Sequence, residues 1–421
     1  IPPGYKQTEV GVIPEDWEVK LLGDLFDFSG GLSASRDQLS MEGYCYLHYG
    51  DIHTSNRTFI DVRSEQQEIP KLDIPLKKAS STSLLEDGDV VFVDASEDDE
   101  GTSRHVVIIN KDKIPFISGL HTIVAKSKTG ELDHQYRRYC FQTVDIKRQF
   151  RFFAVGTKVS GISKTNIARI TLPVPPVPEQ EAIAEALSDA DAFIESLEQL
   201  ISKKRQIKQG AMQELLTGKR RLPGFSGEWE TKRLGDIAEI RDGTHQTPKY
   251  VENGIPFYSV ENVTNDDFTN TKFISEAEHR FLTRFFKIEK GDILMTRIGS
   301  IGDCKFIDWD VDASFYVSLA LLKIRKGYSA EFICHYSKTE AFKKDIELHS
   351  LQSAIPKKIN LGPISDVKIK IPDNSDEQEA IAAILSDMDS EITALEEKLA
   401  KARQLKQGMM QELLTGRIRL L

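Results

Sequence analysis

The stretch EQEAIAEALSDADAFIESLEQLISKKRQIKQGAMQELLTGKRRL (residues 179–222) returns later in the chain as EQEAIAAILSDMDSEITALEEKLAKARQLKQGMMQELLTGRIRL (residues 377–420). About 28 of the 44 aligned positions are identical, far beyond chance for a repeat of this length. In both copies apolar residues recur at alternating steps of four and three, which is the rhythm of helices that pack on one another. The repeat therefore predicts two long helices with matching apolar stripes.

A helix of roughly 38 residues is about 57 Å long, and two such helices most simply pair antiparallel. Whether they pair within one chain or between chains is left open by the sequence. Gly218 and Gly416 stand where a left-handed residue ends a helix. Gly210 and Gly408 lie inside the helices, where glycine is unfavourable, and predict a kink or a close crossing. The apolar stripes comprise Ile183, Leu187, Ala190, Ile194, Leu197 and Ile201 in the first copy, and Ile381, Leu385, Met388, Ile392, Leu395 and Leu399 in the second.

The two copies also share polar residues outside the apolar stripe. A single helix of this kind is most simply one arm of a core hairpin, but helix packing alone does not require matching solvent-side residues. Two copies of one partner, docked on two equivalent surfaces, would require them. The predicted partner-binding residues are Arg205, Gln206, Lys208 and Gln209, which recur as Arg403, Gln404, Lys406 and Gln407.

The segments that precede the helices echo one another more faintly. Residues 17–25 match 229–237, and residues 88–93 match 291–296, a turn that leads into a buried strand. Both segments mix strand-rich runs with short helices, so the predicted fold class is α+β: two globular domains separated by two long, antiparallel helices in a pseudo-two-fold repeat. The predicted boundaries are domain 1 at 1–178, helical repeat 1 at 179–217, domain 2 at 218–376 and helical repeat 2 at 377–421.

Composition sets the broad class of the protein. A chain of 421 residues should form two or more domains. Its four cysteines are scattered without a CxxC pair, no apolar run is long enough to span a bilayer, and no signal-peptide pattern opens the chain, so we expect a cytoplasmic protein with reduced thiols. The net charge of -10 argues weakly against a nucleic-acid partner, because DNA responds to the local field and not to the sum.

Motifs for catalysis are missing from the sequence. The Pro-Pro pairs at 2–3 and 175–176 lack the Asp/Asn and aromatic neighbours of an adenine methyltransferase turn. Gly156 and Gly161 have the spacing of a phosphate-binding loop, but no lysine follows Gly161. The Glu-x-Lys triplets at 18–20 and 230–232 suggest a nuclease, yet they fit the first strand of each domain better. The nine histidines show no metal-ligand spacing.

The order of these pieces resembles the specificity subunits of type I restriction–modification systems, and the resemblance covers essentially the whole chain. It is carried by the opening at 13–19, the Gly-Thr-His-Gln-Thr-Pro loop at 243–248, the strand at 291–297 and the Pro-x-x-Glu-Gln-x-Ala-Ile junction into each helix, where Pro372 stands two residues further upstream in the second copy. The first domain departs most, with Asp94–Glu100 where the second has Arg297–Gly302.

The resemblance implies a non-catalytic subunit that reads a bipartite, asymmetric site on double-stranded DNA. Each domain would read a few base pairs, with the helices as a ruler between half-sites about 34 Å apart. It also implies docking of two adenine-methyltransferase subunits and of restriction motor subunits. This chain would hold no cofactor or metal, while S-adenosylmethionine, ATP and Mg²⁺ would belong to its partners.

Candidate DNA-contacting residues follow from the side chains that direct readout uses and from basic residues suited to phosphates. We expect Asp94 and Arg297 to occupy equivalent strand ends, where their opposite chemistry would help to give the half-sites different sequences. Arg297 is the strongest candidate because it leaves a buried strand and enters a Gly-Ser loop. The candidates are Ser96, Ser103, Arg104, His105, Lys158, Ser160, Ser163 and Lys164 in the first domain, and Thr244, His245, Gln246, Lys249, Tyr250, Arg297, Ser300, Lys357 and Lys358 in the second.

Two other functions remain open from sequence. A coiled-coil adaptor that joins two proteins explains the helices and the acidic charge, but not two strand-rich domains with divergent polar loops. A self-contained methylase or nuclease is disfavoured by the missing motifs.

Overall fold

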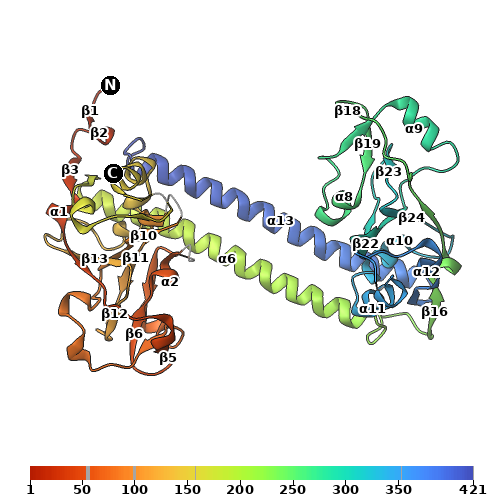
Figure 1. Cartoon of the computed structure of the whole chain (residues 1–421), viewed down its shortest axis with the longest axis horizontal. Helices are drawn as coiled ribbons and strands as arrows, with labels where there is room; N and C mark the ends of the chain where they lie inside the picture. Colours follow the sequence, from red (N-terminus) through yellow and green to blue (C-terminus); the bar gives the residue numbers. More distant parts are fainter. Residues whose placement is uncertain (54–56, 98–100, 157, 352, 421) are drawn as a thin grey trace. The chain divides into compact units, whose positions relative to one another are not determined.

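The computed structural model describes residues 1–53, 57–97, 101–156, 158–351 and 353–420 (Figure 1). Two compact units divide the chain: unit 1 consists of Ile1–Leu197 and Lys398–Leu421, and unit 2 of Glu198–Glu397. The two long helices, α6 (Val177–Leu215) and α13 (Ser375–Leu413), have 39 residues each and contribute one end to each unit. Among the described residues, no helix combines the length and the apolar character needed to cross a membrane.

Unit 1 is built on a five-stranded sheet with the order β4-β13-β9-β11-β7, beside a four-stranded sheet with the order β12-β6-β8-β5. Its helices are α1 (Leu22–Leu25), α2 (Tyr49–His53), α3 (Val62–Glu65), α4 (Val144–Phe153) and α5 (Lys164–Ile167). Its strands are β1 (Tyr5–Thr8), β2 (Gly11–Pro14), β3 (Glu18–Leu21), β4 (Phe26–Gly30), β5 (Leu39–Ser40), β6 (Tyr44–Leu47), β7 (Phe59–Asp61), β8 (Lys71–Leu72), β9 (Val90–Val93), β10 (Ala95–Ser96), β11 (His105–Ile109), β12 (Phe116–Ser118), β13 (Thr122–Ser127), β14 (Ser160–Gly161) and β15 (Thr171–Val174).

Unit 2 repeats this plan with the sheet orders β17-β24-β21-β22 and β18-β20-β19-β23. Its helices are α7 (Leu234–Ile237), α8 (Val260–Asn265), α9 (Glu276–Leu282), α10 (Ala330–Tyr336), α11 (Glu340–His349) and α12 (Leu361–Asp366). Its strands are β16 (Trp229–Arg233), β17 (Ala238–Asp242), β18 (Tyr250–Val251), β19 (Ile255–Tyr258), β20 (Lys272–Ile274), β21 (Ile293–Ile298), β22 (Ser300–Phe306), β23 (Ser314–Phe315), β24 (Leu319–Ile324) and β25 (Lys368–Pro372).

The weakly similar segments of the two domains form equivalent structural elements. Residues 17–25 form β3 and α1, and residues 229–237 form β16 and α7. A strand at the end of each domain pairs antiparallel with β3 or with its equivalent: β15 with β3, and β25 with β16. Asp89 and Asp292 close the same tight turn, since each accepts a backbone N–H three residues upstream. Each buried carboxylate also forms an ion pair with a lysine of the neighbouring strand: Asp89 with Lys126, and Asp292 with Lys323. The duplication therefore includes the scaffold of both domains.

The helix ends belong to the cores of the domains. Ile183, Leu187 and Leu413 are buried with Trp17 and Phe92 in the core of unit 1. In unit 2 the equivalent ends of the helices pack in the same way, with Leu215, Ile381 and Leu385 against Leu234 and Phe332. Because each domain buries the start of one helix and the end of the other, the apolar stripe predicted from the sequence extends into both hydrophobic cores.

Ion pairs between the helices show that they run antiparallel within one chain. In unit 1, Lys406 of α13 bonds to Asp191 of α6, with 2.5 Å between Nζ and Oδ1. In unit 2, Lys208 of α6 bonds to Asp389 of α13. These are the same two positions of the repeat with the helices exchanged. The question that the sequence left open is answered: the two repeats pair with each other.

Two glycine pairs in the repeat have different roles. Gly218 and Gly416 end the helices in the left-handed region with φ of +70° and +69°, as predicted. Gly210 and Gly408 do not mark a close crossing, because a Cβ placed on either would meet nothing within 4 Å among the described residues. Both helices run on through these glycines. The prediction of a close crossing was therefore wrong.

Candidate nucleic-acid interface

In unit 2, three segments far apart in the sequence meet at the end of strand β21. Thr244 forms a bridge with Tyr316, and the backbone N–H of Arg297 donates to the carbonyl of Ser318 over 2.9 Å. On the other side, Ile298 forms a bridge with Lys358. This strand-end edge, formed by 242–246, 297–300, 316–318 and 357–358, brings together candidate residues that the sequence separated by more than a hundred positions.

Unit 1 has the same edge at the end of β9. Ser96 of β10 pairs with Ser160 of β14, so two of the candidates become neighbours. The backbone N–H of Asp94 donates to the carbonyl of His121, and its carbonyl accepts from Ile162. Arg297 makes the equivalent backbone bonds with Ser318 and Ile359 in unit 2. Asp94 and Arg297 therefore occupy equivalent strand ends, as the sequence predicted. Residues 98–100 of the insertion that begins at Asp94 lie outside the described residues.

The exposed candidates form a polar and basic set around these edges. Lys357 carries an ion pair with Glu347 at 2.6 Å, and Tyr250 stacks beneath the ammonium of Lys272 at 4.8 Å. Ser163 caps α5 by accepting the backbone N–H of Asn166, so its hydroxyl has a structural role as well. The exposed candidates are Lys158, Ser163, Lys164, His245, Gln246, Lys249, Tyr250, Ser300 and Lys357, and the half-buried ones are Arg104, Ser160, Thr244 and Lys358.

Three candidates in the first domain are buried, although a side chain that reads DNA has to be exposed. Ser96, Ser103 and His105 are each less than a tenth exposed. The His105 imidazole lies against the rings of Phe92 and Phe141, at 5.5 and 5.0 Å between centroids. Burial lowers the pKa of His105 to about 4, because the charged form would lose its solvation. Its position in β11, a central strand, makes it a core residue.

Arg297 requires a correction of the same kind. Only 4% of this residue is exposed, since the strand end turns its side chain inward. Its Nε donates to the carbonyl of Ile359 over 3.2 Å, and its Nη1 donates to Oδ2 of Asp242 over 3.1 Å. A guanidinium committed to these two partners and covered from solvent holds the edge together and is not presented to a base.

An aromatic segment beside the same edge escaped the sequence analysis. Phe281 and Phe285 are 62% and 81% exposed, and the guanidinium of Arg284 lies over both rings at 4.7 and 4.5 Å. Leu282, Thr283, Phe286 and Lys287, which alternate with these residues, line a cavity of about 250 Å³ together with the loop at 242–244, so the segment adjoins the strand-end edge. The signal in the sequence was an arginine interleaved with aromatic residues, a combination typical of nucleic-acid-binding segments.

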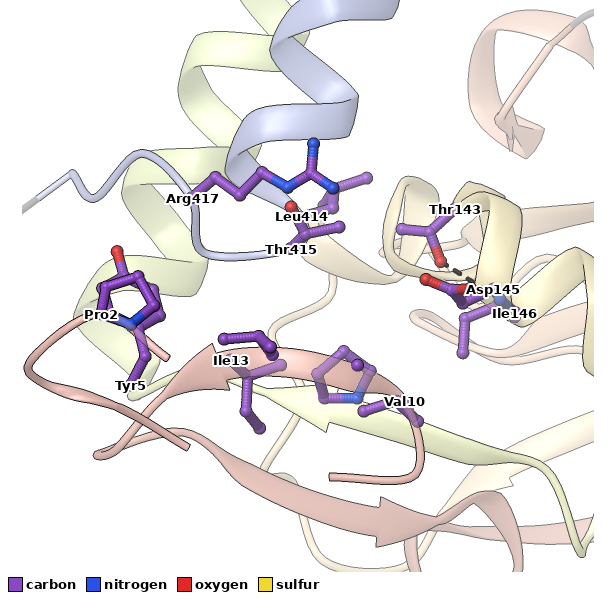
Figure 2. Close-up of a pocket in the computed structure, with 13 residues that line it drawn as sticks. Pro2, Tyr5, Val10, Ile13, Thr143, Asp145, Ile146, Leu414, Thr415 and Arg417 are labelled. Carbon is purple, nitrogen blue, oxygen red and sulfur yellow. Dashed lines mark hydrogen bonds between the residues drawn. The ribbon is translucent and has the colours of Figure 1, made fainter. Parts of the chain in front are cut away.

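A separate cavity of about 580 Å³ opens in unit 1 between the β1–β2 hairpin, the start of α4 and the end of α13 (Figure 2). Val10, Ile13 and Leu414 supply much of its apolar wall. Its two charged residues are engaged with neighbours on their own segments: Asp145 with Arg148, and Arg417 with Glu412. None of its lining residues is a candidate for DNA contact, and they do not bring an acid and a base together for catalysis.

The predicted partner-binding residues of the helices divide into two groups. Lys208 and Lys406 are half-buried in ion pairs between the helices. Helix pairing therefore explains why lysine stands at this position in both copies of the repeat. The assumption that all the shared polar residues face outward was wrong for these two. Arg205 is exposed and bonds to Glu396. The remaining exposed members are Gln206, Gln209, Arg403, Gln404 and Gln407.

A matching apolar pair lies among these exposed residues. Ile207 is 49% exposed and its counterpart Leu405 is 67% exposed, although both stand in long amphipathic helices. Gly210 and Gly408, one turn further along, leave open space above the helix backbone. We call residues 206, 207 and 210 and their counterparts 404, 405 and 408 the twin helix faces. Their recurrence is a feature that pairing of the two helices does not explain.

Titratable groups do not assemble into a metal site in the part of the chain that the structure describes. No group of three or more His, Cys, Asp or Glu side chains has the geometry to hold a metal ion among these residues. Burial raises the pKa of the thiols of Cys45, Cys140, Cys304 and Cys334, which keeps them protonated and unreactive as nucleophiles.

Two similar domains, each with a polar strand-end edge and joined through paired helices, define a protein that presents two different surfaces on one scaffold. The family model of the type I restriction modification DNA specificity domain matches residues 14–206 and 226–404. The chain belongs to this family. Two tandem matches agree with the duplicated fold, and together they cover most of the chain.

Curated relatives match almost the whole length of this chain. The chain is 24% identical to the putative type I restriction enzyme MjaX specificity subunit of Methanocaldococcus jannaschii, covering 99% of this chain and 96% of the relative. The MjaVIII specificity subunit of the same organism is also 24% identical with the same coverage. In fold, the chain is similar to the crystal structure of a type I restriction–modification S subunit from M. genitalium, with a TM-score of 0.61 and 17% identity over 98% of this chain and 99% of that one. A chain from a structure of the type I restriction–modification system gives a TM-score of 0.54 at 19% identity, over 96% and 99% of the two chains.

Proposed function

We propose that this chain selects the DNA target of a type I restriction–modification enzyme, with domain 1 (1–178) reading one half of a bipartite site and domain 2 (218–376) the other. The observation that carries the proposal is the pair of strand-end edges: one scaffold presents different polar loops at equivalent places. A protein that recognises two unlike half-sites needs this combination. A coiled-coil adaptor has no use for it.

The exposed residues at each edge suit DNA. Lys158 and Lys164 in domain 1, and Lys249 in domain 2, supply positive charge for phosphates. His245 and Gln246 carry hydrogen-bonding groups that match base edges in the major groove. The Phe281–Arg284–Phe285 segment adds the guanidinium of Arg284 beside them, which would contact phosphates. These local features outweigh the net charge of -10, because charges far from the DNA are screened by salt.

The twin helix faces are proposed to dock two copies of one methyltransferase subunit. Exposed Ile207 and Leu405 would lose contact with water on docking, and the glycines would admit close approach of a partner's backbone. Beside Arg205 lies a groove of about 550 Å³ in which Arg205 pairs with Glu396 and Lys208 with Asp389. Lys338 and Lys343 in its lining would accept acidic side chains of the partner. Restriction motor subunits would join the assembly later.

In this arrangement the chain contributes recognition and no bond-making step. The helices of 39 residues, each about 58 Å long, are long enough to hold half-sites one DNA turn apart. S-adenosylmethionine for methylation, and ATP and Mg²⁺ for restriction, would be bound by the partner subunits. The chain itself would determine where those subunits act.

The experiment is adenine-methylation mapping, by long-read sequencing, of DNA from cells that carry this chain with its cognate methyltransferase. The expected result is one split motif, with two short unlike halves around a fixed unspecified gap. Cells with the methyltransferase alone are the control and should lack the motif. Methylation that does not depend on this chain, although the methyltransferase is active, would favour the adaptor function instead.

A further inference from the structure

The strand-end edge of unit 2 holds an exposed imidazole against a carboxylate. Nε2 of His245 lies 2.8 Å from Oδ2 of Asp242, and the His245 side chain is 71% exposed. The same carboxylate oxygen receives the buried guanidinium of Arg297 at 3.1 Å. Asp242 thus links a buried cation to a ring at the surface. The exposed His245–Asp242 pair contributes little to stability.

Unit 1 presents an imidazole at the same edge with different residues. Nδ1 of His121 lies 3.2 Å from Oδ1 of Asp94, and the His121 side chain is 48% exposed. The ring of Tyr49 contacts it edge-on, with 5.4 Å between centroids. Here the carboxylate follows β9, whereas Asp242 ends β17 and the position equivalent to Asp94 is Arg297. The two domains therefore reach the same arrangement from different strands, which copying of one ancestral sequence does not explain.

A carboxylate partner determines which ring nitrogen an imidazole offers to a ligand. An ionised carboxylate can only accept, so the ring nitrogen that faces it must carry the hydrogen. In the neutral ring the other nitrogen then has a lone pair, at Nδ1 of His245 and at Nε2 of His121. A fixed acceptor of this kind is complementary to an exocyclic amino group, which adenine and cytosine display in the major groove.

We propose that His121 and His245 each read one base pair of the bipartite target, by accepting a hydrogen bond from a base amino group. Asp94 and Asp242 fix the ring nitrogen that is offered. Arg297 is a positioning residue that holds Asp242 in place from the buried side. This inference rests on the proposed function and names the side chains that give part of its specificity.

The test uses the complete methyltransferase complex with this chain and maps base frequency at every position of the methylated motif. His245→Ala should relax one position in one half of the motif, where preference for the native base falls about five- to tenfold. His121→Ala should do the same at one position in the other half. His134→Ala is the matched control, because His134 is also about half exposed and faces a carboxylate, Asp87 at 3.8 Å, but stands outside both edges.

The positioning role of Arg297 is tested by base preference at one motif position, which a purely structural role would not change selectively. Arg297→Met should relax the same position as His245→Ala, the double variant should relax it no further, and Arg297→Lys should restore part of the preference. Asp242→Asn, which keeps the size of the side chain, tests the link if Arg297→Met fails to fold. An equal loss of methylation at every position would make Arg297 structural and overturn its assignment.

The outcomes separate this inference from the function on which it rests. If the wild-type chain gives the split motif but neither histidine variant relaxes a position, the imidazoles do not read bases and the inference is overturned. Uniformly weaker methylation in the histidine variants overturns it as well, because phosphate contacts carry no sequence information. If the wild-type chain directs no split motif, the proposed function itself has failed.

Discussion

Two glutamates at the helix starts are buried charged residues that link the two long helices to their domains. Glu179 is 2% exposed and receives the guanidinium of Arg419 at 2.6 Å as well as the indole N–H of Trp17. In unit 2, Glu377 is fully buried and bonds to Arg221 at 2.6 Å. In both units the segment that follows one long helix returns to neutralise the start of the other.

Removing one partner of such a pair leaves a buried charge without compensation. We expect Arg419→Met to lower the free energy of unfolding of unit 1 by roughly 3 kcal/mol, and Arg419→Met with Glu179→Gln to recover part of that loss. Urea unfolding followed by tryptophan fluorescence measures both. Arg36→Ala is the control: its pair with Asp51 is exposed and should contribute less than about 1 kcal/mol. Equal effects of the two arginines would contradict the prediction.

Each unit also contains a buried histidine whose pKa burial lowers to about 4: His105 in unit 1 and His335 in unit 2. In the unfolded chain an imidazole titrates near 6.5, so between about pH 6.5 and 4 the unfolded state binds more protons. Stability is therefore lost as the pH falls through this window, by up to about 3 kcal/mol for each histidine. Thermal melting from pH 7 to pH 4 should show the loss, and His105→Phe should reduce it. An unchanged pH slope in that variant would contradict the assignment.

At the scale of elements, the long helices pair with each other and also leave matching residues exposed. Their apolar stripe and the Lys208–Asp389 and Lys406–Asp191 pairs hold them together. The twin helix faces are the surfaces that we propose to bind a partner. The sequence predicted both long helices because a repeat of three and four residues is visible without any tertiary contact. It did not separate pairing lysines from exposed glutamines, since helical spacing alone does not tell which polar residues meet the second helix.

The glycines test the proposed docking face. Gly210→Ala with Gly408→Ala should stabilise the isolated chain, by about 0.5–1 kcal/mol for each site, because alanine favours the helix and meets no neighbour within 4 Å. The same double variant should weaken assembly with the methyltransferase, as should Ile207→Asp with Leu405→Asp. Thermal melting and analytical ultracentrifugation provide the two measurements. A stabilised chain that assembles normally would remove the glycines from the docking face.

At the scale of the whole molecule, each domain is stabilised within its own unit. The core of unit 2 takes its buried residues from domain 2 and from the adjoining ends of both helices. Replacing residues 222–376 with the corresponding segment of another family member should therefore change one half of the methylated motif and leave the other half unchanged. The reciprocal exchange of residues 1–178 should change the other half. Methylation mapping checks both, and a change in both halves after either exchange would refute the domain assignment.

The sequence by itself determined the duplicated architecture, the two helices and the family, because each is a periodic or repeated pattern that local residues express. The tertiary structure alone decided which polar candidate residues are exposed and which are buried. Arg297 was the strongest candidate in the sequence, yet it is buried against Asp242, 55 positions away, while His245 is exposed on the same carboxylate. No sequence motif selected His121 as a candidate, and only the folded structure places it beside Asp94. Burial depends on neighbours that are distant along the chain, and the order of residues does not specify those neighbours until the strands have paired.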